Sequence, residues 1–191
     1  MVSLFISSLE EKYQLPPQSV KMMLLLETCL GIEKSYELAS ADQRVWGVQL
    51  GAEDLTADMQ ARRTKYGAEI QYARAKIVMS ARAAGVEVYD TPFTDMQDDK
   101  AFEKDVQYAK DCGFSGKTAI NPKHVKSINK IFLPTKKEIE YAHAVLEALA
   151  EGKAAGKGAV SLNGKMIDRP IMLRAQNVLE AEELFQEESK R

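Results

Sequence analysis

Short apolar runs alternate along the chain with longer segments in which apolar residues recur every three or four positions. The short runs lack a regular polar/apolar alternation, which is typical of strands that are buried on both faces of a parallel sheet. The longer segments have the spacing of amphipathic helices. The predicted strands are residues 21–26, 45–50, 86–89 and 117–120, and the predicted helices are residues 32–39, 67–84, 99–112 and 122–131.

Residues at the helix ends fit this assignment. Gly85 and Gly113 directly follow two of the predicted helices, at the position where glycine commonly ends a helix. Asn121 precedes Pro122, and this order is typical of a helix start, with asparagine as the cap and proline at the first helical position. The alternation of strands and helices predicts an α/β fold with right-handed crossovers and a parallel sheet.

The pattern changes after residue 132. Thr135 and Glu138 have the spacing of a capping box, which predicts a helix from residue 136 to about 151. The dipeptide Asn163-Gly164 predicts a tight β-hairpin, because both residues accept the positive φ angles of a type I′ turn. A last amphipathic helix is predicted from residue 170 to about 186.

Composition narrows the classes of function. The 191 residues suit one domain of ordinary size, and a hydrophobic content of 45% is enough for a substantial core. The net charge of −2, with no basic stripe, predicts no binding to nucleic acid or to an anionic membrane surface. No apolar run approaches the length of a membrane span, and the N-terminus does not resemble a signal peptide. The two cysteines form no CxxC pair, so we expect a reduced, cytoplasmic protein.

Carboxylates follow two consecutive strands. Glu27 comes directly after the first predicted strand, and Asp54 comes four residues after the second. The carboxyl ends of parallel strands meet at one edge of the sheet, with neighbouring strands about 4.8 Å apart. Two carboxylates at that separation repel each other unless a cation lies between them, and Mg²⁺ is commonly held by one or two carboxylates. The alternative is that Asp54 caps a helix and Glu27 faces solvent.

Other polar residues near strand or helix ends allow two readings each. Asp90 precedes Thr91-Pro92 and is either a turn former or a group on the ligand side. Asn121 is either a helix cap or a substrate-binding residue, and Asp168 stands where the cap of the last helix is expected. Lys123, with the adjacent His124, either faces the phosphates of a bound thioester or is solvated like most loop cations.

At several of these residues the chain resembles a known family. It is similar to the beta subunit of citrate lyase and its relatives, the HpcH/HpaI aldolase-type lyases that act on citryl-, citramalyl- and malyl-thioesters. The resemblance covers nearly the whole chain from residue 20. The stretches that carry it are LLLETCLGI (24–32), LGAEDLTADMQARRT (50–64), YARAKIVMSARAAGVEVYDTPFTDMQDD (72–99), GFSGKTAINPKHV (113–125) and AVSLNGKMIDRPIMLRAQNVL (159–179).

The resemblance implies a TIM barrel with a C-terminal extension in a homotrimer. Residues 1–133 would be the C-terminal half of the (β/α)8 barrel, and residues 134–191 the extension, which makes oligomer contacts. By the same resemblance Glu27 and Asp54 match the family's two Mg²⁺ ligands. Asp168 matches the catalytic acid that reaches into the site of a neighbouring subunit.

The implied reaction is cleavage of a carbon–carbon bond. A citryl thioester, carried by CoA or by an acyl carrier protein, would give oxaloacetate and an acetyl thioester, with Mg²⁺ as Lewis acid and Asp168 as general acid. Asn121 and Lys123 are the candidate substrate-binding residues. Citramalyl-CoA and malyl-CoA are the alternative substrates.

The chain also departs from the family. Family members are roughly a hundred residues longer at the N-terminus, where the first four strands of the eight-stranded barrel would lie. That segment also carries an arginine for the substrate carboxylate, which has no counterpart here. We therefore expect either a split enzyme, whose missing half comes from a partner in a larger lyase complex, or a truncated, non-catalytic relative that acts as an assembly partner.

Overall fold

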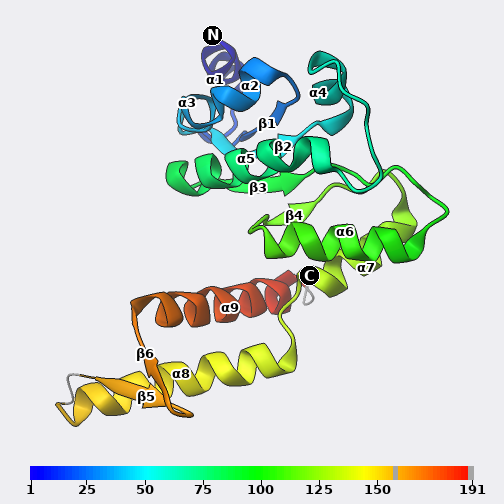
Figure 1. The fold of residues 1–191 in the computed structure, drawn as a ribbon. Helices are drawn as coiled ribbons and strands as arrows, with labels where there is room; N and C mark the ends of the chain where they lie inside the picture. Colours follow the sequence, from blue (N-terminus) through cyan, green and yellow to red (C-terminus); the bar gives the residue numbers. More distant parts are fainter. Residues whose placement is uncertain (157–158, 189–191) are drawn as a thin grey trace. The chain divides into compact units, whose positions relative to one another are not determined.

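The computed structural model describes residues 1–156 and 159–188. The chain divides into two compact units, Met1–Phe132 and Leu133–Arg191. The first unit contains a four-stranded sheet and the second a pair of long helices with a small hairpin (Figure 1). No helix in the described part of the chain is long and apolar enough to cross a membrane.

The sheet of the first unit confirms the predicted α/β fold. Its strands are all parallel and lie side by side in the order in which they occur along the chain. All their carboxyl ends therefore meet at the same edge. The strands are β1 (Met22–Leu26), β2 (Val45–Leu50), β3 (Glu87–Asp90) and β4 (Gly116–Lys117).

The strands and helices of this unit follow the predicted alternation, with three differences. The predicted helix 32–39 is two short helices that begin earlier, because the Thr28 side chain accepts a hydrogen bond from the Gly31 amide and caps the first. The last strand is shorter than residues 117–120, since Ala119 and Ile120 have left the sheet. A helix that was not predicted, α4, follows β2 directly. The helices are α1 (Val2–Lys12), α2 (Cys29–Glu33), α3 (Ser35–Ala39), α4 (Ala52–Asp58), α5 (Gln71–Ala84), preceded by the 3-10 turn Ala68–Ile70, α6 (Asp99–Asp111) and α7 (Pro122–Phe132).

One face of the sheet forms the core of the unit, and the other is open to solvent. Val48, Leu50 and Val88 pack against Ile77 and Ala81 of α5, and all five are fully buried. Side chains on successive strand positions point to opposite faces. In β1 the opposite face therefore carries Met23 and Leu25, which alternate with the core residue Leu26 and are 40% and 51% exposed. The register of β1 and β2 shifts beside Trp46, and the 47% exposed Trp46 ring lies 5.8 Å from that of Tyr89, which alternation with Val88 places on the open face.

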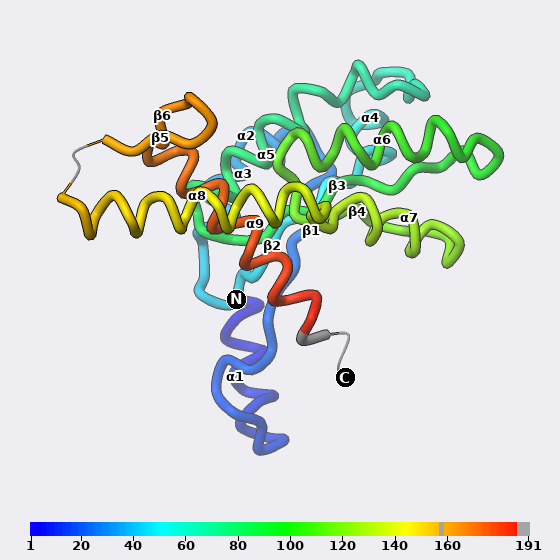
Figure 2. The backbone as a smooth tube through the Cα atoms, turned by 90° about the horizontal axis from the view of Figure 1, so that it is seen from below, coloured from blue at the N-terminus to red at the C-terminus, as the bar shows by residue number. Residues whose placement is uncertain are grey.

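Helix α1 is attached to the sheet mainly through a buried ion pair. Arg44, just before β2, donates to both oxygens of Glu10 at 2.6 and 2.7 Å. The amides of Gln18 and Val20 also donate to that carboxylate. These hydrogen bonds lower the pKa of Glu10 to about 2, and the bond from Arg44 has the largest effect. Figure 2 shows α1 lying apart from α5 and α6, and its Phe5 is exposed.

The second unit follows the sequence pattern closely. Thr135 and Glu138 form the expected capping box at the start of α8 (Lys136–Ala154). The hairpin of β5 (Val160–Leu162) and β6 (Lys165–Ile167) turns at Asn163 and Gly164, whose φ angles are 51° and 77°. Helix α9 (Arg169–Glu188) then packs along α8 (Figure 1). The buried core of this unit is Ala142, Val145, Ile167 and Ala175.

Candidate metal site at the strand ends

The ends of β1 and β2 bring two acidic residues together. Glu27 is the first residue after β1, and Asp54 lies in the first turn of α4, four residues after β2. The Gly51 amide donates to the Leu26 carbonyl at 3.0 Å and so continues the pairing of the two strands beyond their ends. This backbone bond fixes the loop that carries Asp54 beside the loop that carries Glu27.

The carboxyl groups of Glu27 and Asp54 lie within hydrogen-bonding reach of each other. The pKa of Glu27 is raised, first by its partial burial and then by the hydrogen bond to Asp54 and the negative charge of that group. A close carboxylate pair with a raised pKa is an arrangement that enzymes use in acid-base and metal sites.

A divalent cation fits the chemistry of this pair. Mg²⁺ prefers carboxylate oxygens, and its protein sites often supply only one or two of them, with water and substrate oxygens completing the octahedron. Among residues 1–156 and 159–188 no group of three or more histidine, cysteine, aspartate or glutamate side chains is placed to hold a metal. The Glu27–Asp54 pair therefore suits a hard ion that is shared with a ligand, and not a closed structural metal site.

Gly51 makes room for the Glu27 side chain. A Cβ atom at position 51 would lie 2.7 Å from the Glu27 Cβ and 2.9 Å from its Oε2. The backbone of Gly51 has φ −101°, which any residue adopts, so the requirement for glycine here comes from space alone.

We expect Gly51→Ala to displace the Glu27 carboxylate without unfolding the chain. A shift of about 1 Å in one ligand is enough to weaken a preorganised site by tenfold or more. Titration calorimetry with Mg²⁺ measures the loss. Gly85→Ala is the control for a mutated glycine: nothing lies within 4 Å of its added Cβ, although its φ of 72° makes the alanine strained. Unchanged Mg²⁺ binding by Gly51→Ala would contradict the prediction.

Cys29 lies two residues after Glu27 but is not set up as a nucleophile. Its amide donates to Asp58 Oδ2 at 2.7 Å, and its thiol also contacts that carboxylate. The pKa of the Cys29 thiol is raised, first by its contact with Asp58 and second by burial. Since the thiolate is the nucleophilic form, this environment disfavours covalent catalysis at Cys29.

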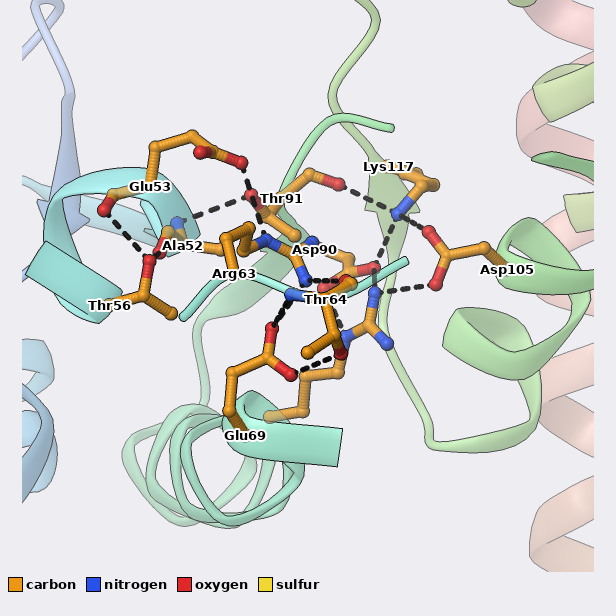
Figure 3. A network of polar contacts seen from close by, with 11 residues as sticks. Ala52, Glu53, Thr56, Arg63, Thr64, Glu69, Asp90, Thr91, Asp105 and Lys117 are labelled. Atoms are coloured by element: carbon orange, nitrogen blue, oxygen red, sulfur yellow. Dashed lines mark hydrogen bonds and ion pairs between the residues drawn. The ribbon is translucent and has the colours of Figure 1, made fainter. Parts of the chain in front are cut away.

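The ends of β3 and β4 are joined by a buried ionic cluster of Arg74, Asp90, Asp105 and Lys117. Asp90, fully buried at the end of β3, accepts from Arg74 Nε and Nη2 at 3.0 and 2.8 Å and from Lys117 Nζ at 2.6 Å. Asp105 of α6 pairs with the same two cations at 2.8 and 2.6 Å. Figure 3 shows the side chains of Asp90, Lys117 and Asp105 converging from β3, β4 and α6. The cluster contains two positive and two negative groups, so it is balanced in charge.

The ionic cluster shows the role of Asp90, which the sequence predicted to be either a turn former or a group on the ligand side. The carboxylate is used within the fold and is neither a simple turn former nor a group exposed to a ligand. The role of Arg74 was not predicted, although a signal was present. Arg74 is four residues after Ile70 and three before Ile77, on the apolar face of its helix, where an unpaired arginine would be costly.

Asn121 and Lys123 both have partners within the first unit. The Asn121 side chain accepts from the Lys123 amide at 2.9 Å and so caps α7. Lys123 Nζ donates to the Met96 carbonyl at 2.6 Å and lies 3.3 Å from Asp99. His124 is buried and stacks on Phe102, with a ring-centroid distance of 3.9 Å. Substrate binding by Asn121 and Lys123 stays a prediction, whereas His124 is buried in the packing against Phe102.

Asp168 belongs to the second unit, between β6 and α9. Its Oδ1 accepts from the Ile171 amide at 3.1 Å, so it has the capping role that its position in the sequence suggested. The side chain is exposed. A cap can also act as an acid when it is exposed, so its catalytic role stays a prediction.

Comparison with known proteins decides the family. The model of the HpcH/HpaI aldolase/citrate lyase family matches residues 2–122. The chain belongs to this family. It is also 41% identical, over 174 residues, to the citrate lyase subunit beta of Leuconostoc mesenteroides subsp. cremoris. That alignment covers 91% of this chain but 58% of the relative, so this family member spans little more than half the length of the curated relative.

Solved structures support the fold. The chain is 27% identical to the protein CitE from Mycobacterium tuberculosis, whose structure is a complex with magnesium, acetoacetate and coenzyme A. That match has a TM-score of 0.70 and covers 84% of this chain and 60% of the other. A citrate lyase structure from Burkholderia xenovorans LB400 has a TM-score of 0.80 at 19% identity, covering 96% and 59% of the two chains. The second likeness is one of fold alone.

Proposed function

We propose that this family member is the metal-binding part of a carbon–carbon lyase that cleaves a citryl thioester into oxaloacetate and an acetyl thioester. The observation that carries the proposal is the close Glu27–Asp54 carboxyl pair at the carboxyl ends of neighbouring parallel strands. The solved relative that contains magnesium and coenzyme A supports both the metal and the thioester class of substrate.

In this proposal the residues have separate roles. Glu27 and Asp54 hold Mg²⁺, which when bound supplies a Lewis acid for the substrate oxygens. The carbinol hydroxyl loses its proton to solvent and its oxygen becomes the keto oxygen of oxaloacetate, while the bond between the carbinol carbon and the thioester α-carbon breaks and leaves its electron pair on the α-carbon as an enolate. The protonated carboxyl group of Asp168 from a neighbouring copy then gives its proton to that carbon and regains one from solvent. Because Asp168 Oδ1 caps α9, we assign the proton transfer to Oδ2.

Asn121 and Lys123 lie in the segment that follows β4, and we propose that they face the substrate. Their hydrogen bonds hold the start of α7 against the loop that contains Met96. The positive charge of Lys123 suits the phosphates of CoA or the phosphopantetheine of an acyl carrier protein.

We also propose that the open sheet of the first unit is half of a (β/α)8 barrel. Its apolar face with Met23, Leu25 and Trp46 needs a cover, and the strands β1 and β4 end the sheet. The preceding βα units of the family, on the same or on a second polypeptide, would satisfy both needs. The second unit would then mediate contacts in a homotrimer or a larger cytoplasmic lyase complex.

The test is to assay the purified chain for Mg²⁺-dependent release of oxaloacetate from citryl-CoA, alone and with the N-terminal part of the Leuconostoc relative added in trans. We expect activity only in the mixture, and we expect Asp168→Asn to remove it. Citramalyl-CoA and malyl-CoA in the same assay test the alternative substrates. If the mixture cleaves none of the three thioesters although the two chains associate stably, the result would favour a non-catalytic assembly partner instead.

A further inference from the structure

Helix α4 carries Asp54 but has no cap of its own. Its N-cap residue is Gly51, which has no side chain to accept hydrogen bonds from the first turn. A helix start exposes amide groups that need partners, particularly where they are buried. Ala52, the first residue of α4, is 1% exposed, so its amide requires an acceptor from elsewhere in the fold.

Thr91 supplies that acceptor from the next strand. Its Oγ1 accepts from the Ala52 amide at 3.2 Å, across 39 positions of sequence. Thr91 directly follows β3 and is itself 1% exposed. The hydroxyl therefore acts as the cap of α4 in place of Gly51, which is kept small by the nearby Glu27 side chain.

Thr91 is held from its other side by the ionic cluster. Lys117 Nζ donates to the Thr91 carbonyl at 2.7 Å while it also pairs with Asp90 and Asp105. Figure 3 shows the resulting row of contacts, from Asp105 through Lys117 and Thr91 to Ala52. The buried Thr91 hydroxyl thus fixes the start of α4. Thr91 is in turn held by Lys117 of β4, which pairs with Asp105 of α6.

We infer that Thr91 is a positioning residue for the metal site, because its hydroxyl holds the helix turn in which Asp54 meets Glu27. This inference rests on the proposed Mg²⁺-binding role of the pair. Loss of the hydroxyl leaves the buried Ala52 amide without its acceptor, so the first turn of α4 loosens and Asp54 moves away from Glu27.

Thr56 provides a matched control in the same helix. Its hydroxyl is also buried, and it donates to the carbonyls of Ala52 and Glu53 at 2.9 and 3.0 Å. Thr56→Val and Thr91→Val therefore each delete one buried hydroxyl that hydrogen-bonds to the backbone of α4. The difference is that only the Thr91 hydroxyl ties the start of α4 to β3.

The experiment measures Mg²⁺ affinity by titration calorimetry and the exchange rate of the Ala52 amide by NMR. We expect Thr91→Val to lower the affinity by about tenfold to a hundredfold, the range for residues that orient metal ligands. It should also speed exchange of the Ala52 amide. Thr91→Ser keeps the hydroxyl and should restore both, while Thr56→Val should leave the affinity close to that of the parent.

Glu27→Gln separates failure of this inference from failure of the proposed function. If Glu27→Gln loses Mg²⁺ affinity but Thr91→Val does not, the positioning role of Thr91 is overturned and the metal pair stands. Equal losses in Thr91→Val and Thr56→Val would also overturn it, since any damage to α4 would then suffice. If Glu27→Gln binds Mg²⁺ no more weakly than the parent, the metal pair itself is wrong, and the inference with it.

Discussion

Asp90→Asn should lower the free energy of unfolding of the first unit by about 3–5 kcal/mol, the cost of leaving a buried charge without its partner. Asp90 is fully buried and receives three charged hydrogen bonds, two from Arg74 and one from Lys117. Asparagine has nearly the same shape, but it removes one of the two negative charges that balance these cations. Its amide nitrogen would also face a guanidinium or an ammonium group.

Urea unfolding followed by fluorescence measures this effect. Trp46 is the single tryptophan of the chain and lies in β2, so its emission reports on the first unit alone. Asp99→Asn is the matched control, since Asp99 makes an ion pair with Lys123 at 3.3 Å while its side chain is 78% exposed. That change should cost less than about 1 kcal/mol. An Asp90→Asn variant as stable as the control would show that the cluster contributes little to the fold.

The strands were predictable because both faces of the sheet carry apolar side chains, although only one face is buried within this chain. Residues 45–50 form a mostly apolar run because β2 lies between two other strands, and the structure gives the same limits. By contrast, α4 has seven residues and only Ala52, Leu55 and Thr56 buried, which is too few to produce a recognisable period. The split of residues 32–39 was not predicted for the same reason, since each helix has five residues.

The candidate site also contains a part that the sequence pattern predicts and a part that it does not. The proximity of Glu27 and Asp54 was predictable because a parallel sheet places the ends of neighbouring strands at one edge, while their binding of a metal stays a prediction. The partners of Asp90 come from positions 16 and 27 residues away, and the acceptor for Ala52 comes from 39 residues away. Such pairings depend on how helices pack on the sheet, and local patterns do not specify them. Arg74 on an apolar helix face was the one indication that a buried acid had to lie nearby.

Glu27→Gln should have opposite effects on stability and on metal binding. Without metal at neutral pH, the Glu27 carboxylate is partly buried beside Asp54, and its raised pKa shows that the fold disfavours its negative charge. Glutamine removes that charge and keeps the shape, so we expect a higher Tm for the variant in EDTA. The same change removes one of two ligands, which should weaken Mg²⁺ binding by more than about a hundredfold, beyond the usual effect of a residue that only orients a ligand.

The dependence on pH follows from the direction of the pKa shift. The folded chain holds the Glu27 proton more tightly than the unfolded chain does. The contribution of this group to stability is therefore present below 4.5, the ordinary pKa of a glutamate, and is lost as pH rises through the raised value. The stabilisation by Glu27→Gln should be seen near pH 7 and should vanish on acidification below 4.5. In the parent, Mg²⁺ should bind more weakly as pH falls through the raised pKa, because the proton and the ion compete for the same oxygens.

Glu53→Gln is the control for a change of charge in the same turn. Glu53 is next to Asp54 but its carboxylate is directed to Arg63, 3.3 Å from Nε, and not to Glu27. We expect this variant to bind Mg²⁺ like the parent and to show no gain in Tm in EDTA. A similar gain in both variants would mean that any loss of negative charge stabilises the chain. The particular repulsion between Glu27 and Asp54, which a bound cation relieves, would then not be the cause.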